Sequence, residues 1–105
     1  MFPNKRYITM GIKHIIPYPL QQVMWDLIDN LCQESENIDY LQVFEFEDVD
    51  YDREKAVLIH RQEVPIYEKR YLIFLPHYVL KKIHNKKIFI IDAKDYCTML
   101  FSYEY

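Results

Sequence analysis

The sequence is poor in residues that mark several common protein classes. Among its 105 residues there is one glycine, Gly11. The P-loop and the dinucleotide-binding turn each need several glycines at fixed spacing, so the sequence excludes both kinds of phosphate site. Only two cysteines are present, Cys32 and Cys97, whereas a small secreted domain usually carries a larger disulfide framework. We therefore expect both cysteines to be thiols in or near the core of an intracellular protein.

Long apolar runs and a strong charge bias are also missing. No run approaches the roughly 20 residues that a membrane-spanning helix needs, and the first residues, 1–6, lack the apolar stretch of a signal peptide. The chain carries 13 basic and 16 acidic residues, a net charge of −3, which argues against a nucleic-acid binder with a broad basic surface. Because half of the residues are apolar, we expect a single globular domain over residues 1–105, located in the cytoplasm.

The clearest element is a long amphipathic helix over about residues 19–34. Apolar residues recur there at helical spacing, while the opposite side is polar. Pro19 suits the first turn of a helix, where its missing N–H costs nothing. We expect the apolar stripe to face the core, with Trp25 and Cys32 at its edge. The stripe consists of Leu20, Val23, Met24, Leu27, Ile28 and Leu31.

The rest of the chain is rich in β-branched and aromatic residues, which favour strands. The expected strands are residues 6–14, 40–47, 56–64, 66–75, 87–92 and 96–103. Segment 88–91 is apolar on both faces, which is typical of a central strand. Leu80 and Ile83, at helical spacing, predict a short helix near 77–84. The sequence therefore predicts an α+β fold in which a single antiparallel sheet carries the long helix on one face.

Four short segments resemble a known family in their order along the chain. They are Arg6-Tyr7-Ile8-Thr9, Trp25-x-x-Ile28-Asp29, Asp39-Tyr40-Leu41-Gln42-Val43-Phe44 and Gln62-Glu63-x-Pro65-x-Tyr67. Up to about Leu75 the chain is similar to the bacterial family called domain of unknown function 960, whose members are small Gram-positive proteins often found on staphylococcal mobile cassettes. The resemblance implies a cytoplasmic accessory protein that serves a mobile element in replication, transfer or anti-defence. It brings no catalytic residues to this sequence.

Catalytic and metal-binding patterns are weak. His77 and His84 flank the predicted short helix, and His60 and Cys97 lie on strands that could meet across the sheet. Neither pair has the short spacing of a zinc motif. No hydroxyl nucleophile stands on a glycine-flanked turn, and Cys97 lacks an evident third group to orient a His60 base. We expect no enzymatic activity, metal or cofactor.

An acidic hairpin is the first candidate site, for docking a partner protein. It connects two predicted strands, and its residues are Glu47, Asp48, Asp50, Tyr51, Asp52 and Glu54. The spacing imitates the start of a calcium loop, but the glycine and the final glutamate of that motif are missing. The sheet face opposite the helix is a second docking candidate and could also form a homodimer. We expect it to carry the aromatic residues Tyr67, Tyr71, Tyr96, Tyr103 and Tyr105.

An alternative function is the binding of single-stranded nucleic acid. Basic and aromatic side chains are interleaved in the second half of the chain, a pattern that can follow a phosphate backbone and stack on bases. The residues are Tyr67, Lys69, Arg70, Tyr71, Lys81, Lys82, Lys86 and Lys87. The sequence leaves the choice between this surface and the docking surfaces open.

Overall fold

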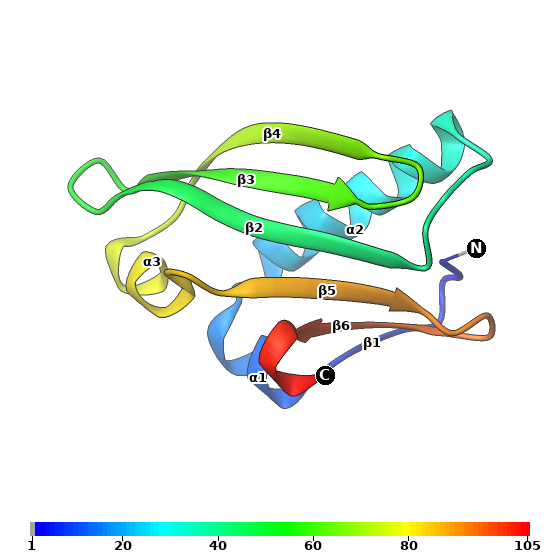
Figure 1. Ribbon diagram of the computed structural model, residues 1–105. Helices are drawn as coiled ribbons and strands as arrows, with labels where there is room; N and C mark the ends of the chain where they lie inside the picture. The colour runs from blue at the N-terminus through cyan, green and yellow to red at the C-terminus, as the bar shows by residue number, and fades with distance from the viewer. Residues whose placement is uncertain (1) are drawn as a thin grey trace.

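A computed structural model describes residues 2–105 as an α+β fold with one sheet (Figure 1). The elements in chain order are β1 (Arg6–Ile8), α1 (Met10–Ile15), α2 (Tyr18–Glu34), β2 (Leu41–Asp50), β3 (Lys55–Gln62), β4 (Tyr67–Phe74), α3 (His77–Ile83), β5 (Lys87–Asp92), β6 (Cys97–Phe101) and the 3-10 turn η1 (Ser102–Glu104). No helix among these residues is long and apolar enough to cross a membrane.

The sheet is mixed, so the prediction of a purely antiparallel sheet is wrong. Its strand order is β1-β6-β5-β2-β3-β4, and β1 runs parallel to β6 while the other neighbours are antiparallel. Two backbone bonds join the two ends of the chain: Cys97 N donates to Lys5 O at 3.0 Å, and Thr9 N donates to Met99 O at 3.1 Å. Pairing between segments this far apart leaves no local pattern in a sequence, which explains the error.

The first strand is much shorter than the predicted segment 6–14. The strand stops at Ile8, because Thr9 caps a helix instead: its Oγ1 accepts a hydrogen bond from Ile12 N at 3.3 Å. Ile12 and Ile16 are buried and Ile15 is partly buried, at the spacing of one helix face. The alternation of apolar residues up to Ile12 is also typical of a strand, which explains the prediction. The cap at Thr9 and the helical spacing of the buried isoleucines favour the helix α1 instead.

Helix α2 begins at Tyr18 and ends at Glu34, close to the predicted range 19–34. Its buried face is turned slightly from the predicted one. Val23 is exposed, whereas Trp25 is buried and has the Arg6 guanidinium 4.8 Å from its ring centre. Arg6 also forms an ion pair with Asp29, so β1 and α2 hold each other in place.

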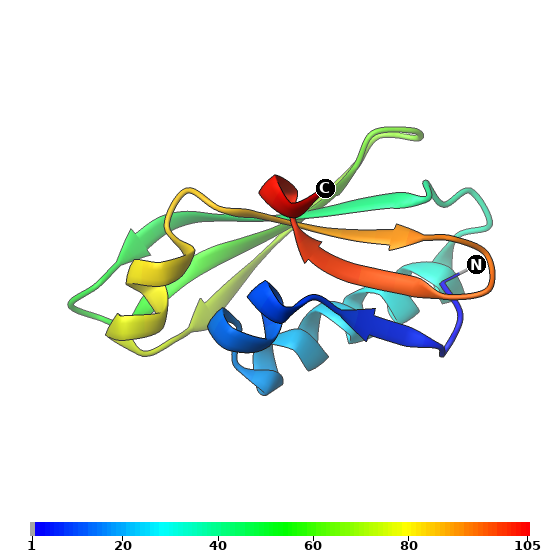
Figure 2. The same ribbon diagram turned by 90° about the horizontal axis from the view of Figure 1, so that it is seen from below.

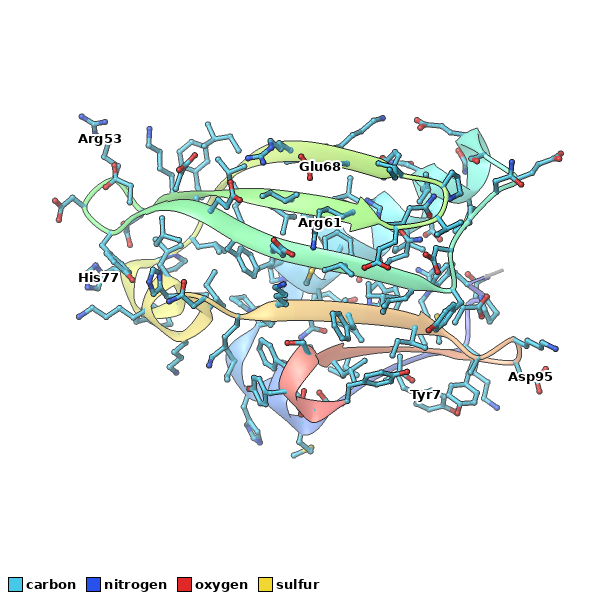
Figure 3. All side chains as sticks on the ribbon, in the orientation of Figure 1. Tyr7, Arg53, Arg61, Glu68, His77 and Asp95 are labelled. Carbon is cyan, nitrogen blue, oxygen red and sulfur yellow. The ribbon has the colours of Figure 1, made fainter. Side chains whose placement is uncertain are left out.

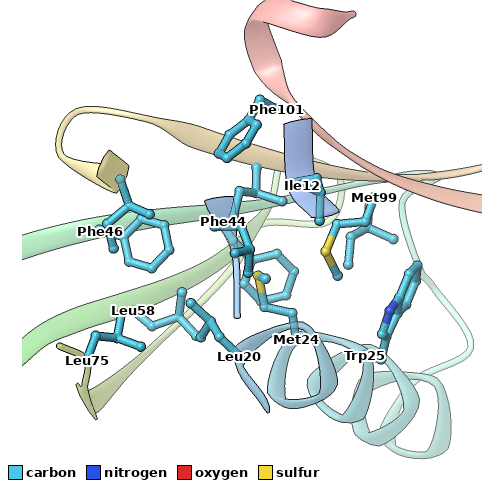
Figure 4. Close-up of a cluster of buried hydrophobic side chains, with 14 of the residues drawn as sticks. Ile12, Leu20, Met24, Trp25, Phe44, Phe46, Leu58, Leu75, Met99 and Phe101 are labelled. Atoms are coloured by element: carbon cyan, nitrogen blue, oxygen red, sulfur yellow. The ribbon is translucent and has the colours of Figure 1, made fainter. Parts of the chain in front are cut away.

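The core lies between the sheet and the layer formed by α1 and α2 (Figure 2). Figure 4 shows side chains of both helices and of β2, β3 and β6 meeting there: Ile12, Leu20, Met24, Trp25, Phe44, Phe46, Leu58, Met99 and Phe101. Strand β5 lies inside the sheet between β6 and β2, as predicted; Ile88 and Ile90 on its core face are fully buried, whereas Phe89 and Ile91 on the other face are partly buried. Helix α3 joins β4 to β5 at one end of the sheet (Figure 1).

Candidate interaction surfaces

The predicted acidic hairpin is real, but it is shorter than expected and partly engaged. Strand β2 continues to Asp50, so the turn itself spans only residues 51–54. Glu47 forms an ion pair with Arg70 at 2.8 Å, and the Asp50 carboxylate accepts a hydrogen bond from Arg53 N at 3.1 Å. Among the described residues, Asp48 and Asp52 have no such partner. Only this part of the predicted negative charge is therefore free for a ligand.

The hairpin also anchors helix α3. The Glu54 carboxylate accepts a hydrogen bond from His77 N at 2.7 Å, which caps a helix whose own preceding residue, Pro76, offers no side-chain cap. The Tyr51 ring lies 5.5 Å from the His77 ring and 6.2 Å from the His84 ring, centre to centre. Figure 3 shows Arg53 and His77 at this same end of the molecule. Tyr51 and Glu54 therefore serve the fold.

The predicted nucleic-acid residues do not gather on one face. Tyr67, Lys69 and Tyr71 are in register with core-facing residues of β3 and so point toward the helices, whereas Arg70 points to the other side. The remaining basic residues are spread over three places. Lys81 and Lys82 lie on α3, Lys86 lies 5.2 Å from the Tyr103 ring centre, and Lys87 pairs with Glu45 at 3.5 Å.

The predicted aromatic face is also divided between the two sides of the sheet. Tyr71 packs against the core, and Tyr67 lies edge-on to the buried His60 ring at 5.3 Å. On the opposite face, Tyr96 packs against Tyr7 at 5.7 Å and Tyr105 against Phe89 at 6.0 Å. Tyr67 and Tyr71 are thus wrongly assigned to the face that Tyr96 and Tyr105 occupy.

A buried polar cluster lies where β2 begins and β3 ends, and no pattern in the sequence predicted it. His60 Nε2 contacts Gln42 Oε1 at 2.7 Å, and Gln42 Nε2 donates to Gln62 Oε1 at 2.8 Å. All three side chains are buried. Because Gln42 Oε1 can only accept, His60 carries its proton on Nε2, which leaves the buried Nδ1 without a partner among residues 2–105.

The environment of His60 keeps this side chain neutral. Burial, aided by the nearby Lys69 charge, lowers the pKa of His60 from 6.5 to about 4. Its ring stacks on Phe44 at 4.5 Å. Cys97, the predicted companion, lies on β6, where its Sγ is 3.4 Å from Pro3 O. Burial raises the pKa of the Cys97 thiol, which opposes formation of a reactive thiolate.

Within residues 2–105 no three His, Cys, Asp or Glu side chains come together in a way that could hold a metal ion. His77 and His84, which the sequence placed on either side of a helix, both turn toward the Tyr51 ring. Both histidines therefore have a packing role beside Tyr51.

The free edge of β4 is a surface that sequence reasoning missed. β4 is the last strand of the sheet, and among the described residues no strand pairs with its outer side (Figure 1). Apolar side chains are exposed at both of its ends, by 91% at Ile66 and 73% at Val64 on one side, and by 60% at Leu72 and 69% at Phe74 on the other. The alternation around Leu72 and Phe74 predicted a strand, but it could not show that this strand is an edge.

An apolar hollow adjoins the Phe74 end of this edge. Its volume is about 300 Å³, and it lies between β4 and the first turns of α2. The lining residues are Pro19, Leu20, Val23, Leu72, Ile73, Phe74 and Leu75. The exposure of Val23, against expectation, contributes to this hollow. We define the β4 docking edge as residues 64–74 together with the hollow.

The fold and these surfaces define a small α+β domain with a six-stranded mixed sheet. The chain belongs to the family of staphylococcal proteins of unknown function known as domain of unknown function 960, whose model matches residues 5–104. That span includes the last strands, beyond the reach of the resemblance seen in the sequence.

A solved structure has the same fold. It is the crystal structure of a protein of unknown function from Enterococcus faecalis, which is 21% identical to this chain, with a TM-score of 0.78. The match covers 100% of this chain and 98% of the other. No curated protein matches the sequence. At this identity the likeness concerns the fold alone.

Proposed function

We propose that this protein is a non-enzymatic interaction module that binds an extended segment of a partner protein along the β4 docking edge. The observation that carries the proposal is the combination of an eight-residue edge strand with exposed apolar side chains at both ends. Proteins usually protect such edges with charge, proline or short length, because free backbone N–H and C=O groups recruit further strands, and β4 carries charge only at Glu68, Lys69 and Arg70. Main-chain bonds would supply affinity, and the hollow beside Phe74 would select a side chain.

A second copy of the chain could pair with this edge in fewer favourable registers than a different protein. When two identical strands pair antiparallel about a two-fold axis, one residue must face its own copy. A self-facing Glu68, Lys69 or Arg70 sets like charges directly opposite one another, whereas a self-facing Tyr71 does not. Like charges in facing positions destabilise a strand pair. The charges of β4 therefore disfavour three of the registers open to a second copy.

The chemistry of a foreign strand follows from the edge. Its charged middle already has partners within the chain, because Lys69 pairs with Glu34 and Arg70 pairs with Glu47 and Glu68, so charge favours no particular residue in the partner. Toward Phe74 the surface is apolar, so the partner segment would place a medium-sized apolar side chain in the hollow of about 300 Å³. The family resemblance leads us to place this partner in the replication, transfer or anti-defence of a mobile genetic element.

The test is a pull-down from a nuclease-treated Gram-positive lysate with three tagged proteins. The wild type is compared with Leu72→Lys/Phe74→Lys at the edge and with Asp48→Asn/Asp52→Lys at the hairpin tip. Both edge residues are largely exposed, so the edge variant should melt within a few degrees of the wild type. We expect a stoichiometric protein that the wild type and the hairpin variant retain and the edge variant loses.

Other outcomes of the pull-down would contradict the proposal. A partner that the edge variant keeps and the hairpin variant loses would return the site to the acidic residues. Proteins that disappear on nuclease treatment would favour the nucleic-acid alternative, which the scattered positions of Lys69, Arg70 and Lys82 do not support. Self-association abolished by the edge substitutions would make the partner a second copy.

A further inference from the structure

A second concave surface, which shares no residue with the β4 docking edge, lies on the side of the sheet that carries the helices. A cleft of about 650 Å³ opens between α1, the turn into α2, and α3, which Figure 2 shows on the same side of the sheet. Its lining residues are Ile8, Lys13, His14, Ile15, Ile16, Pro17, Tyr18, Gln21, Tyr78, Val79 and Lys82. The volume is in the range of sites that hold small molecules.

The charge of the cleft is opposite to that of the whole protein. The chain has 16 acidic and 13 basic residues, yet no acidic residue lines the cleft, and Lys13, His14 and Lys82 do. Among residues 2–105 neither Lys13 nor Lys82 forms an ion pair. A concave surface lined by unneutralised cations concentrates a positive potential and attracts anions.

The floor of the cleft offers a directed polar group. Gln21 is buried, and its Nε2 donates to Ile16 O at 2.9 Å. Within the described part of the chain its Oε1 accepts no hydrogen bond, so this oxygen remains available to a donor on a ligand. A buried amide with one satisfied end is fixed in place and therefore selective.

The rim adds aromatic surface. Tyr18 and Tyr78 both line the cleft and expose most of their side chains. Exposed tyrosine rings beside lysines provide a flat face for a planar ring next to a binding point for negative charge. Val79 and Ile15 complete an apolar wall.

From these four features we infer that the cleft binds a small phosphorylated ligand with a planar ring, of the chemical class of a nucleotide. Lys13 and Lys82 bind the phosphate, a tyrosine ring packs on the planar group, and Gln21 Oε1 accepts a hydrogen bond from it. The inference does not depend on the β4 docking edge, because the two surfaces share no residue.

Calorimetric titration of the full chain with AMP tests this site, with adenosine, inorganic phosphate and an oligothymidylate as separate arms. We expect saturable AMP binding that is stronger than binding of adenosine or phosphate alone. Lys82→Glu should weaken AMP binding about tenfold or more, since it replaces an attraction by a repulsion in a partly enclosed site. Lys81→Glu is the matched control: it has the same charge change on the same helix but does not line the cleft.

The melting temperature of each variant shows whether it remains folded, and Lys13→Glu provides an independent second variant. Three results would overturn the inference. These are no saturable binding of AMP or phosphate up to about 1 mM, an equal loss in Lys81→Glu and Lys82→Glu, or binding of the oligothymidylate without binding of AMP. The last result would assign the cleft to a nucleic-acid chain.

Discussion

At the scale of single residues, His60 is the group whose ionisation is most altered by the fold. It is fully buried, and the pKa of its imidazole falls from 6.5 to about 4 because burial and Lys69 both oppose a second proton. Between these two pH values the unfolded chain binds a proton that the folded chain refuses. The free energy of unfolding therefore has its full value, as far as His60 is concerned, above pH 6.5. It falls progressively as the pH falls toward 4, by up to about 3 kcal/mol.

Replacing His60 by glutamine should flatten this pH dependence. His60→Gln keeps a donor toward Gln42 but removes the titrating group, so its free energy of unfolding should fall less than that of the wild type between pH 6.5 and 4. Urea titrations at several pH values measure the difference, and exposed His14, changed to glutamine, is the control. If His60→Gln loses stability as steeply as the wild type, His60 is not the source of the pH dependence.

The single glycine has a role of its own. A Cβ at Gly11 would lie 2.7 Å from Glu104 Oε2. The Glu104 carboxylate cannot move away freely, since its Oε1 accepts hydrogen bonds from Thr9 Oγ1 and Phe101 N, both at 2.8 Å. The C-terminal turn η1 is tied in this way to the start of α1.

A double-mutant cycle at Gly11 and Glu104 tests this contact, because the effect of Gly11→Ala on the free energy of unfolding should change sign when Glu104 is removed. Gly11→Ala should lower the free energy of unfolding by about 1 kcal/mol in the wild type, because it displaces the Glu104 hydrogen bonds. In a Glu104→Ala background the same change should raise it by about 0.5–1 kcal/mol, since alanine is the better helix former. Chemical denaturation of the four proteins gives both values. An equal effect of Gly11→Ala in both backgrounds would show that Glu104 does not constrain Gly11.

At the scale of elements, helix α3 depends on a residue of the neighbouring hairpin. Glu54 caps its first N–H at 2.7 Å, and Pro76 offers no side-chain cap of its own. Glu54→Ala should therefore cost about 1 kcal/mol of stability. Asp52→Ala removes the same charge from the same turn but no hydrogen bond to a described residue, so it should be nearly neutral. Equal losses in a thermal melt would mean that the capping bond contributes nothing.

How well each element was predicted depends on how local its cause is. The range of α2 and the central position of β5 follow from patterns within each segment, namely a helical apolar stripe and two apolar faces. The prediction of one strand over residues 6–14 was wrong, because the segment shows both strand-like alternation and helical spacing. The cap at Thr9 favours the helix from Met10 onward. The parallel pairing of β1 with β6 depends on residues about 90 positions apart, as in Tyr7 with Thr98, and no local pattern encodes it.

At the scale of the whole molecule, the candidate sites were harder to predict than the fold. The residues of the acidic hairpin could be predicted as a group, since they are neighbours in sequence, but not their engagement with Arg70 and His77. The β4 edge becomes visible only from the strand order. The basic cleft joins Lys13 to Lys82, and only the packing of α1 beside α3 brings them together.

The whole surface separates into a docking edge on β4, a basic cleft between α1 and α3, and a hairpin whose carboxylates partly serve the fold. Strand addition at β4 is the central claim, and photocrosslinking in living Gram-positive cells tests it most directly. A benzophenone-bearing amino acid replaces Phe74 in one protein and Asp52 in another, since both positions are exposed. We predict a discrete crosslink to a different protein from position 74 and none to that protein from position 52. A crosslink to that protein from position 52 alone, or to nucleic acid, would contradict docking at the β4 edge.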